Sequence, residues 1–466
     1  MSTNATSPRR RIAAVAVSSL LAAACDASPG ANSMAPAPAA PAIESFVSAP
    51  DAVFVGEPAT LTAVFSGDSA AIKGIGPVQS GVPVASPALA RATTFTLVVR
   101  SGSQEVDARL TVPAVYRDRF RALAPSPIAR TQHVAMALAG GGALAMGGNA
   151  SDSPNVPDAD STDRFDPVGE TVSPGPTLAF SAMATFTATA QLPGGGLLLI
   201  GGGVNSGTEL GGVDGIRATQ AFDPAAGTFS RVGDLASRHR LGATATLDDG
   251  RVLVAGGEVP STTAAERYDP SSGTWSSAGD MGTRRRGHTA TTLGDGRVLL
   301  AGGVSCCDAA GETLTGTAEI FDPARGEFTP TGSLGTARAF HSATLLTDGR
   351  VLVTGGLVDL SASTTASAEI YDPSTGLFGP AGEMQIARLA HAAVLLSDGR
   401  VLVLGGVSAS PLTDLYDPGS DRWSPGPPLQ PAWAWSTATL LDSGKVLVLG
   451  GEDAQGFPVA TAMLFE

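Results

Sequence analysis

The sequence is poor in cysteine, in aromatic residues and in charge. Only three of its 466 residues are cysteine, aromatic side chains make up 5% and charged side chains 15%. Three cysteines cannot build the disulfide framework of a small secreted scaffold. So little charge argues against coiled coils and helical repeats, which are rich in Glu, Lys and Arg. The net charge of −14 comes without a block of basic residues. This argues against nucleic-acid binding, because such binding depends on neutralising phosphates.

Glycine and proline are abundant instead. The 58 glycines and 33 prolines make up about a fifth of the chain. That fraction is below the one typical of disordered chains, and a hydrophobic content of 43% is enough to form buried cores. The length predicts two or more domains, unless an internal repeat builds one large domain.

The N-terminus has the pattern of an export signal. Residues 1–24 contain no acidic residue, and three arginines precede an apolar run at 12–24 that is too short to span a bilayer as a helix. The run ends Leu20-Leu21-Ala22-Ala23-Ala24-Cys25, which resembles a bacterial lipobox, although Ala22 stands where Leu is usual. We expect a signal peptide at 1–24, then a lipidated Cys25 and a flexible tether at 25–42. In the alternative, an ordinary secretory signal is cleaved nearby and Cys25 is incidental.

These features predict a location. The protein is expected to be exported and held at the bacterial cell envelope or cell surface by a lipid anchor. No other stretch of the sequence is long and apolar enough to cross a membrane as a helix.

Residues 43–115 alternate between apolar and polar side chains. Leu61, Ala63 and Phe65 show this period of two, and turn residues such as Gly102 separate the runs. The pattern predicts short antiparallel strands in a β-sandwich. It resembles a bacterial immunoglobulin-like module without the cysteine pair and tryptophan of antibody domains. The resemblance implies a spacer.

Residues 117–466 repeat one pattern seven times. A Gly-Gly pair ends an apolar run, and another glycine lies in a turn six residues before the first Gly of each pair. Four of these turns read Asp-Gly-Arg, which favours a tight hairpin. The pairs are Gly147-Gly148, Gly201-Gly202, Gly256-Gly257, Gly302-Gly303, Gly355-Gly356, Gly405-Gly406 and Gly450-Gly451.

A second motif follows in six units. An aromatic residue precedes Asp-Pro, and a second apolar residue, usually aromatic, stands seven residues later. The segment between them predicts another tight turn. Each unit therefore reads as four antiparallel strands, as in a propeller blade. The motifs resemble the kelch repeat, and the resemblance implies an all-β fold: a seven-bladed kelch β-propeller after the small immunoglobulin-like sandwich.

The spacing also predicts how the ring closes. In five units the second aromatic position lies 13 residues before a first strand, and Phe120 lies 13 residues before His133. The chain ends where a last outer strand is missing. We therefore expect residues 118–123 to supply the outer strand of the last blade.

Loop lengths point to one face of the ring. The two tight turns keep their length, whereas the loop between the second and third strands varies. That loop and the link between blades leave the same face, which we name the long-loop face; the opposite one is the tight-turn face. A fixed scaffold with variable loops favours binding through the loops, around the mouth of the central channel.

An Arg-x-x-His motif recurs at the long-loop face. A cationic ring for an anion or an acidic glycan is one interpretation. The favoured one is a structural role within each blade, because the motif recurs with the repeat. No pair of these histidines has zinc-helix spacing. The residues are Arg130 with His133, Arg285 with His288, Arg338 with His341 and Arg388 with His391.

Residues that break the repeat are better candidates for a ligand site. Trp433 and Trp435 stand in the last blade, and His239-Arg240 in the third. The tryptophans suit a sugar or an inserted peptide side chain, or they fill the gap left by the missing Arg and His. The acidic loop 149–163 is expected to be solvated rather than a calcium site. Cys306 and Cys307 form a possible vicinal disulfide or keep free thiols.

Kelch propellers include the galactose-oxidase-like copper radical oxidases. Those enzymes need two Tyr, two His and a Cys cross-linked to one Tyr, and this chain offers Tyr only at Tyr116, Tyr268, Tyr371 and Tyr416. We therefore expect no such enzyme, no metal site and no cofactor. The sequence favours a binder of an envelope or extracellular protein or glycan. The alternative is a hydrolase or oxidase acting on extracellular polysaccharide at the channel mouth.

Overall fold

The computed structural model describes residues 40–148, 161–179, 188–201, 217–257, 261–308, 311–406, 410–430, 434–453 and 455–466. The signal peptide, Cys25, most of the tether, Trp433, most of the acidic loop and the side chain of Cys307 lie outside this part. In the described ranges the chain is built of strands, with one short 3-10 turn, η1 (Pro193–Gly195). No helix in these ranges is long and apolar enough to cross a membrane.

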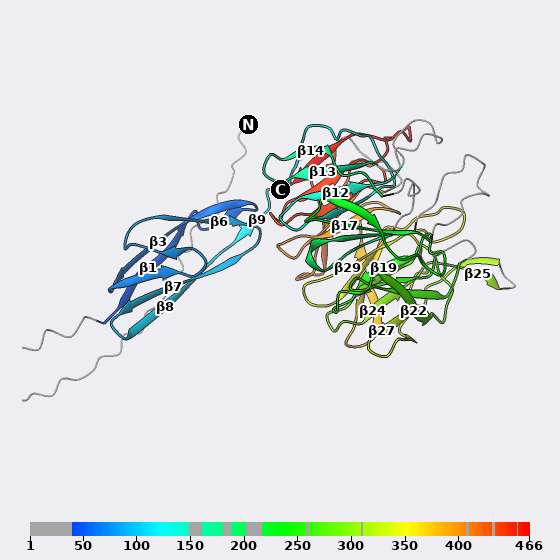
Figure 1. Ribbon diagram of the computed structural model, residues 1–466, viewed down its shortest axis with the longest axis horizontal. Helices are drawn as coiled ribbons and strands as arrows, with labels where there is room; N and C mark the ends of the chain where they lie inside the picture. The colour runs from blue at the N-terminus through cyan, green and yellow to red at the C-terminus, as the bar shows by residue number, and fades with distance from the viewer. Residues whose placement is uncertain are drawn as a thin grey trace, which may run out of the picture.

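The N-terminal β module, residues 42–116, contains two antiparallel sheets (Figure 1). Leu61, Ala63, Leu97 and Val99 are almost fully buried, because alternate side chains of a strand point to the same face. One sheet orders β1 (Ala42–Ala49), β3 (Glu57–Ser66) and β6 (Val84–Leu89); the other orders β5 (Gly76–Pro77), β4 (Ser69–Ile72), β7 (Thr93–Ser101) and β8 (Gln104–Val112). The short strands β2 (Val53–Phe54) and β9 (Ala114–Val115) pair in parallel.

The rest of the described chain forms seven four-stranded antiparallel sheets, named blades 1 to 7. Their second strands are buried along their whole length, because each has a strand on either side and sheets on both faces. Blade 1 contains β11 (Val134–Ala137), β12 (Ala143–Met146), β13 (Thr162–Asp166) and β14 (Thr171–Pro174). Blade 2 contains β15 (Ala188–Gln191), β16 (Leu197–Ile200), β17 (Thr219–Asp223) and β18 (Thr228–Arg231).

The next four blades follow the same order. Blade 3 contains β19 (Ala243–Thr246), β20 (Val252–Ala255), β21 (Ala264–Asp269) and β22 (Thr274–Asp280). Blade 4 contains β23 (Thr289–Thr292), β24 (Val298–Ala301), β27 (Ala318–Asp322) and β28 (Glu327–Pro330), with an extra hairpin of β25 (Val304–Asp308) and β26 (Gly311–Leu314). Blade 5 contains β29 (Ser342–Leu345), β30 (Val351–Thr354), β31 (Ser367–Asp372) and β32 (Leu377–Glu383). Blade 6 contains β33 (Ala392–Leu395), β34 (Val401–Leu404), β35 (Asp414–Asp417) and β36 (Arg422–Pro425).

Blade 7 joins both ends of the ring. It contains β37 (Thr437–Leu440), β38 (Val446–Leu449), β39 (Ala462–Phe465) and, as its outer strand, β10 (Phe120–Ala122). The register pairs Phe120 with Phe465, whose ring centroids lie 5.3 Å apart. The spacing predicted this outer strand. The first strands of neighbouring blades contact one another in turn, from β11 through β15, β19, β23, β29 and β33 to β37 and back to β11, so the ring is closed.

The N-terminal module packs against the propeller on the tight turns of blades 6 and 7. The hydroxyl of Tyr116 donates to the carbonyl of Gly444 and accepts from the backbone N–H of Ser397 at 3.1 Å. The Tyr116 ring stacks on Phe465 at 5.3 Å. One continuous apolar core therefore runs from the module, through Tyr116, into blades 6 and 7.

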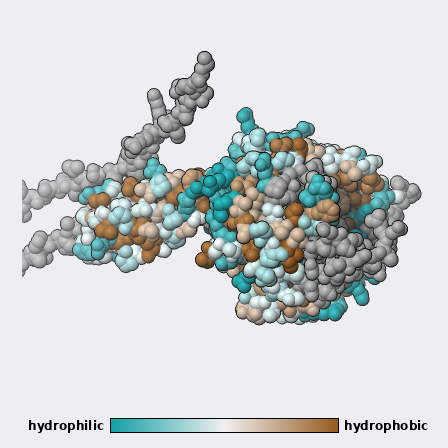
Figure 2. Space-filling view, turned by 90° about the horizontal axis from the view of Figure 1, so that it is seen from above, coloured by the Kyte–Doolittle hydropathy of each residue, from teal (hydrophilic) through white to brown (hydrophobic). Residues whose placement is uncertain are grey.

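Ion pairs of the propeller lie next to the residues of this apolar contact. Arg400 pairs with Asp118 at 2.8 Å, Lys445 with Glu170 at 2.7 Å and Arg119 with Glu466 at 2.6 Å. Figure 2 shows hydrophilic side chains gathered where the two lobes meet. These three pairs join residues of 117–466, so they stabilise the propeller beside the apolar contact.

Candidate functional site

The repeated arginines are buried at the long-loop face, each inside its own blade. Arg285 donates from one terminal nitrogen to the carbonyl of Gly302 at 2.8 Å and from the other to Glu319 at 2.6 Å. Glu319 also accepts the backbone N–H groups of Gly282 and Thr283, in the link from blade 3 to blade 4. The Arg–carboxylate pair therefore holds that link against the end of the second strand.

Three other blades repeat this arrangement. The carboxylate always comes from the residue two places before the repeated aromatic, on the third strand. Such fully desolvated, hydrogen-bonded pairs serve the fold, and each arginine is at most 1% exposed, so these arginines do not offer a free cationic ring to a ligand. The pairs are Arg130 with Asp163, Arg338 with Glu369 and Arg388 with Asp414.

His239 stands in the place of the missing arginine of blade 3. Its Nδ1 lies 2.6 Å from the carbonyl oxygen of Gly256 and its Nε2 lies 3.1 Å from Glu266. Both partners match those of the arginines, and His239 is only 3% exposed. The sequence interpretation of His239 as a break in the repeat is therefore corrected: this imidazole substitutes for a guanidinium in the same structural role.

This substitution gives a testable prediction at Arg285. Arg285→Ala leaves Glu319 buried without its cation and should lower the free energy of unfolding by about 3–5 kcal/mol. Arg285→His should lower it by only about 1 kcal/mol, because a histidine already serves this position in blade 3. Urea unfolding of the two variants measures the difference. Equal losses would contradict the equivalence of His239 and the arginines.

The repeated histidines line the mouth of the channel and are neutral. Burial, and then the charge of the neighbouring arginine, lowers the pKa of His133, His341 and His391 to about 3. The same causes hold the pKa of His288 well below its usual value. Uncharged imidazoles do not attract anions, so the histidines do not support the cationic ring either.

Most of these histidines bond to the first strand of the preceding blade. His341 Nε2 lies 3.0 Å from the hydroxyl of Thr289, and His133 Nε2 lies 2.9 Å from that of Thr437. In the described part of the chain, neither ring nitrogen of His288 has a partner. The reason is that Ala243 occupies the position of Thr289 in blade 3 and carries no hydroxyl.

Two small cavities lie at the channel mouth. One, of about 270 Å³, is lined by Leu241, Phe340 and His288 among others. The other, of about 280 Å³, is lined by Gln132, Ala390, His391, Trp435 and Ser436 among others, and none of its lining residues is Asp, Glu, Lys or Arg. The half-buried Trp435, predicted as a ligand residue, therefore borders an uncharged cavity; its predicted companion Trp433 lies outside the described part.

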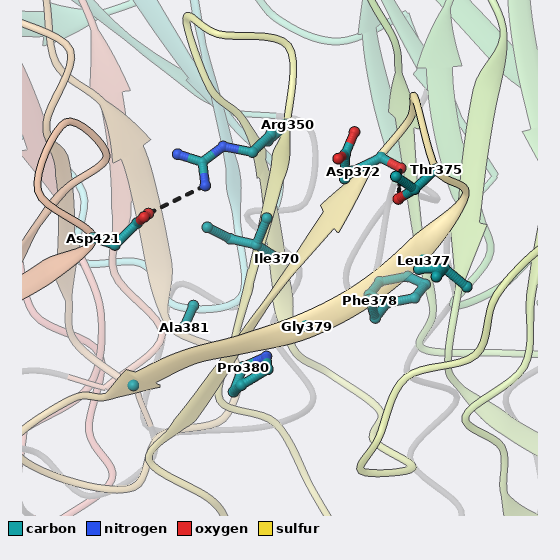
Figure 3. Close-up of a pocket in the computed structure, with 11 residues that line it drawn as sticks. Arg350, Ile370, Asp372, Thr375, Leu377, Phe378, Gly379, Pro380, Ala381 and Asp421 are labelled. Atoms are coloured by element: carbon teal, nitrogen blue, oxygen red, sulfur yellow. Dashed lines mark hydrogen bonds and ion pairs between the residues drawn. The ribbon is translucent and has the colours of Figure 1, made fainter.

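The tight-turn face carries grooves between neighbouring blades. One of about 900 Å³ lies between blades 2 and 3, and one of about 420 Å³ lies between blades 5 and 6. In the second, Figure 3 shows Arg350 and Asp421 facing each other across the groove, with 3.2 Å between their nearest side-chain atoms. A similar groove lies between blades 3 and 4. These grooves recur with the repeated turns, so they follow from the blade architecture.

The remaining candidates lie on blades 3 and 4. Arg240 is half-buried, and its equivalent in blade 4, Arg286, donates to both carboxylate oxygens of Glu312 on β26 at about 3 Å. Cys306 is buried and disulfide-bonded. Its pairing with Cys307 stays a prediction.

Sequence reasoning missed two features of this region. The acidic partners Asp163, Glu266, Glu319, Glu369 and Asp414 stand at a fixed distance before the repeated aromatics, so the repeat itself carried the signal. The second feature is a left-handed residue two positions before the first strand of blades 1 and 3–7. Its φ is +53° at Gln132, +52° at Phe340, +49° at Ala390 and +56° at Trp435.

The residues present do not fit a copper radical site. Tyr268, Tyr371 and Tyr416 are buried in blade cores against Trp275, Phe378 and Trp423, and Tyr116 lies at the module contact. Among the described residues, no group of three or more His, Cys, Asp or Glu is placed to hold a metal ion.

The fold defines the chain as a β-propeller with kelch-like repeats. A family model of the Kelch motif matches residues 239–282, which run from His239 past the outer strand of blade 3. No curated protein matches the sequence. Among solved structures, the chain is similar to a protein described as a novel fungal alcohol oxidase with catalytic diversity among the AA5 family, in complex with copper. The TM-score is 0.59, the identity 17% and the coverage 75% of each chain. At this identity the similarity establishes the fold alone.

Proposed function

We propose that this protein is a kelch propeller, anchored at the cell envelope by a lipid on Cys25, that binds a protein or a glycan through its long-loop face. In this proposal residues 25–42 are a tether and the N-terminal module is an immunoglobulin-like stalk. The propeller is the seven-bladed binding head.

The position of the N-terminal module carries the proposal. Its contacts through Tyr116 and Val55, and the ion pair of Asp118 just after it, fall on the tight turns of blades 6 and 7. A stalk attached to the tight-turn face leaves the long-loop face for a partner. The contact is one continuous apolar core, so it supports a fixed orientation of the head on the stalk.

The chemistry of the channel mouth also suits binding. The cavity beside Trp435 is uncharged, and the aromatic ring offers a large contact area at low entropic cost. The buried arginines and neutral histidines already serve the fold. The residues that differ between blades are therefore the ones left to select a ligand.

A glycan array and a pull-down from envelope extracts, both with the full chain, test this function. We expect at least one protein or glycan to be captured, and its binding to fall about 10-fold or more in Trp433→Ala plus Trp435→Ala. Leu377→Ala, an exposed position on β32, is the matched control and should bind like the unmodified chain. Interactions that the double variant leaves unchanged would refute the proposed face.

A further inference from the structure

Backbone groups at the channel mouth form part of a hydrogen-bonded ring. In blades 4 to 6, the left-handed residue donates its N–H to the carbonyl of its counterpart in the preceding blade. Gly287 donates to Leu241 at 2.9 Å, Phe340 to Gly287 at 2.7 Å and Ala390 to Phe340 at 3.0 Å. We name this ring the mouth annulus. Blades 3 to 6 are thereby joined head to tail around the channel.

The annulus is open between blades 6, 7 and 1. Among the described residues, no backbone hydrogen bond joins Ala390 to Trp435 or Trp435 to Gln132. Within the described ranges, the carbonyl of Ala390 and the N–H groups of Trp435 and Gln132 therefore have no backbone partner. A ligand that shields this gap from water must therefore supply partners for these backbone groups. The counterpart in blade 2 lies outside the described residues.

The gap coincides with the uncharged cavity of about 280 Å³. The cavity is also lined by Ser436, a residue only 8% exposed, whose buried hydroxyl has no partner in the part of the chain that the structure describes. Ser436 stands where four other blades carry histidine. We call the gap in the mouth annulus, together with this cavity, the opening. It combines two backbone donors, one backbone acceptor, a buried hydroxyl and the indole of Trp435.

From this combination we infer that the opening binds an uncharged peptide segment of a partner protein, one of whose peptide groups completes the mouth annulus between Ala390 and Trp435. A peptide group carries one N–H for the carbonyl of Ala390 and one C=O for the N–H of Trp435. Binding of this kind resembles the addition of a peptide strand to a sheet edge. There, main-chain hydrogen bonds provide the affinity and contacts with neighbouring side chains provide the sequence specificity. The inference rests on the proposed function and narrows it from protein or glycan to peptide.

Hydrogen exchange tests the open annulus directly. In the full chain, the amides of Gly287, Phe340 and Ala390 should exchange slowly, whereas those of Trp435 and Gln132 should exchange at least about 10-fold faster. Selective ¹⁵N-tryptophan labelling resolves the amide signal of Trp435, since the chain has only four tryptophans. Protection of Trp435 and Gln132 equal to that of Phe340 would overturn the inference.

Peptide selection tests the ligand class. The full chain is screened against a displayed library of short uncharged peptides and, in parallel, against a glycan array. Trp435→Gly should weaken peptide binding about 10-fold or more, and N-methylation of one peptide bond should do the same because it removes the donor. Phe340→Gly is the matched control, because Phe340 has the same left-handed backbone in the closed part of the annulus; it should change binding less than about twofold.

Each remaining outcome decides between the two proposals. A glycan whose binding Trp435→Gly abolishes, with no peptide selected, overturns the peptide inference and leaves the proposed function standing. Peptides that bind Trp435→Gly as well as the unmodified chain also overturn the inference. Failure of both screens and of the envelope pull-down removes the proposed function together with it.

Discussion

Lowering the pH from 7 to 5 should cost the folded protein about 6 kcal/mol of stability through His133, His341 and His391 alone. Their pKa is about 3 in the folded protein and 6.5 in an exposed histidine. Because the folded pKa values are the lower ones, unfolding takes up protons below pH 6.5. Stability that is fully present above pH 6.5 is then lost as the pH falls toward 3. At pH 5 each of the three groups accounts for about 2 kcal/mol.

Urea unfolding at a series of pH values measures this loss. The slope of stability against pH near 5 should correspond to about three protons taken up on unfolding, and more if His288 contributes. His391→Ser is the matched variant, because a serine occupies this position in blade 7. In His391→Ser, the number of protons taken up on unfolding near pH 5 should fall by about one. A stability that is flat between pH 7 and 5 would show that these histidines are not buried as neutral groups.

Replacing residues 117–124 by a glycine–serine linker of equal length should lower the melting temperature by on the order of 10 °C. The replacement removes β10, and with it the Phe120–Phe465 contact and the ion pairs of Arg119 and Arg121 with Glu466. We expect a loss of about 4 kcal/mol from the half-buried ring and the strand hydrogen bonds. The replacement also exposes the edge of β39, and an unpaired strand edge promotes aggregation.

Differential scanning calorimetry of the linker variant tests the closure. Phe120→Ala should reproduce part of the loss, whereas Leu377→Ala, at an exposed position on another outer strand, should leave the melting temperature nearly unchanged. If the linker variant has the same melting temperature as the unmodified protein, β10 does not close the ring in solution.

The sequence predicted the blades and the closing strand because those features are local and repeated. The Gly-Gly pairs, the tight turns and the spacing from Phe120 to His133 each depend on residues close together in the chain. The interpretation of His239 was wrong because it compared residue types between blades and not positions. His239 lies 17 residues before Gly256, just as Arg285 lies 17 residues before Gly302.

Contacts between distant segments that the repeat does not encode could not be predicted from the sequence. Tyr116 meets Gly444 across 328 residues, and neither residue carries a local signal for the other. The open part of the mouth annulus could not be predicted either, because it depends on which carbonyl of the neighbouring blade accepts the N–H of each left-handed residue. The sequence could therefore propose one face of the propeller and Trp435 as candidates, but it could not propose the backbone donors and the acceptor beside Trp435.

The use of the long-loop face is the central claim, and photocrosslinking tests it most directly. A benzoylphenylalanine at position 435 lies at the channel mouth. The same group at position 168 lies in a tight turn of blade 1, where Val168 is 92% exposed. In envelope extracts, crosslinked species should form from position 435 and not from position 168. Crosslinks from position 168 alone would contradict the account.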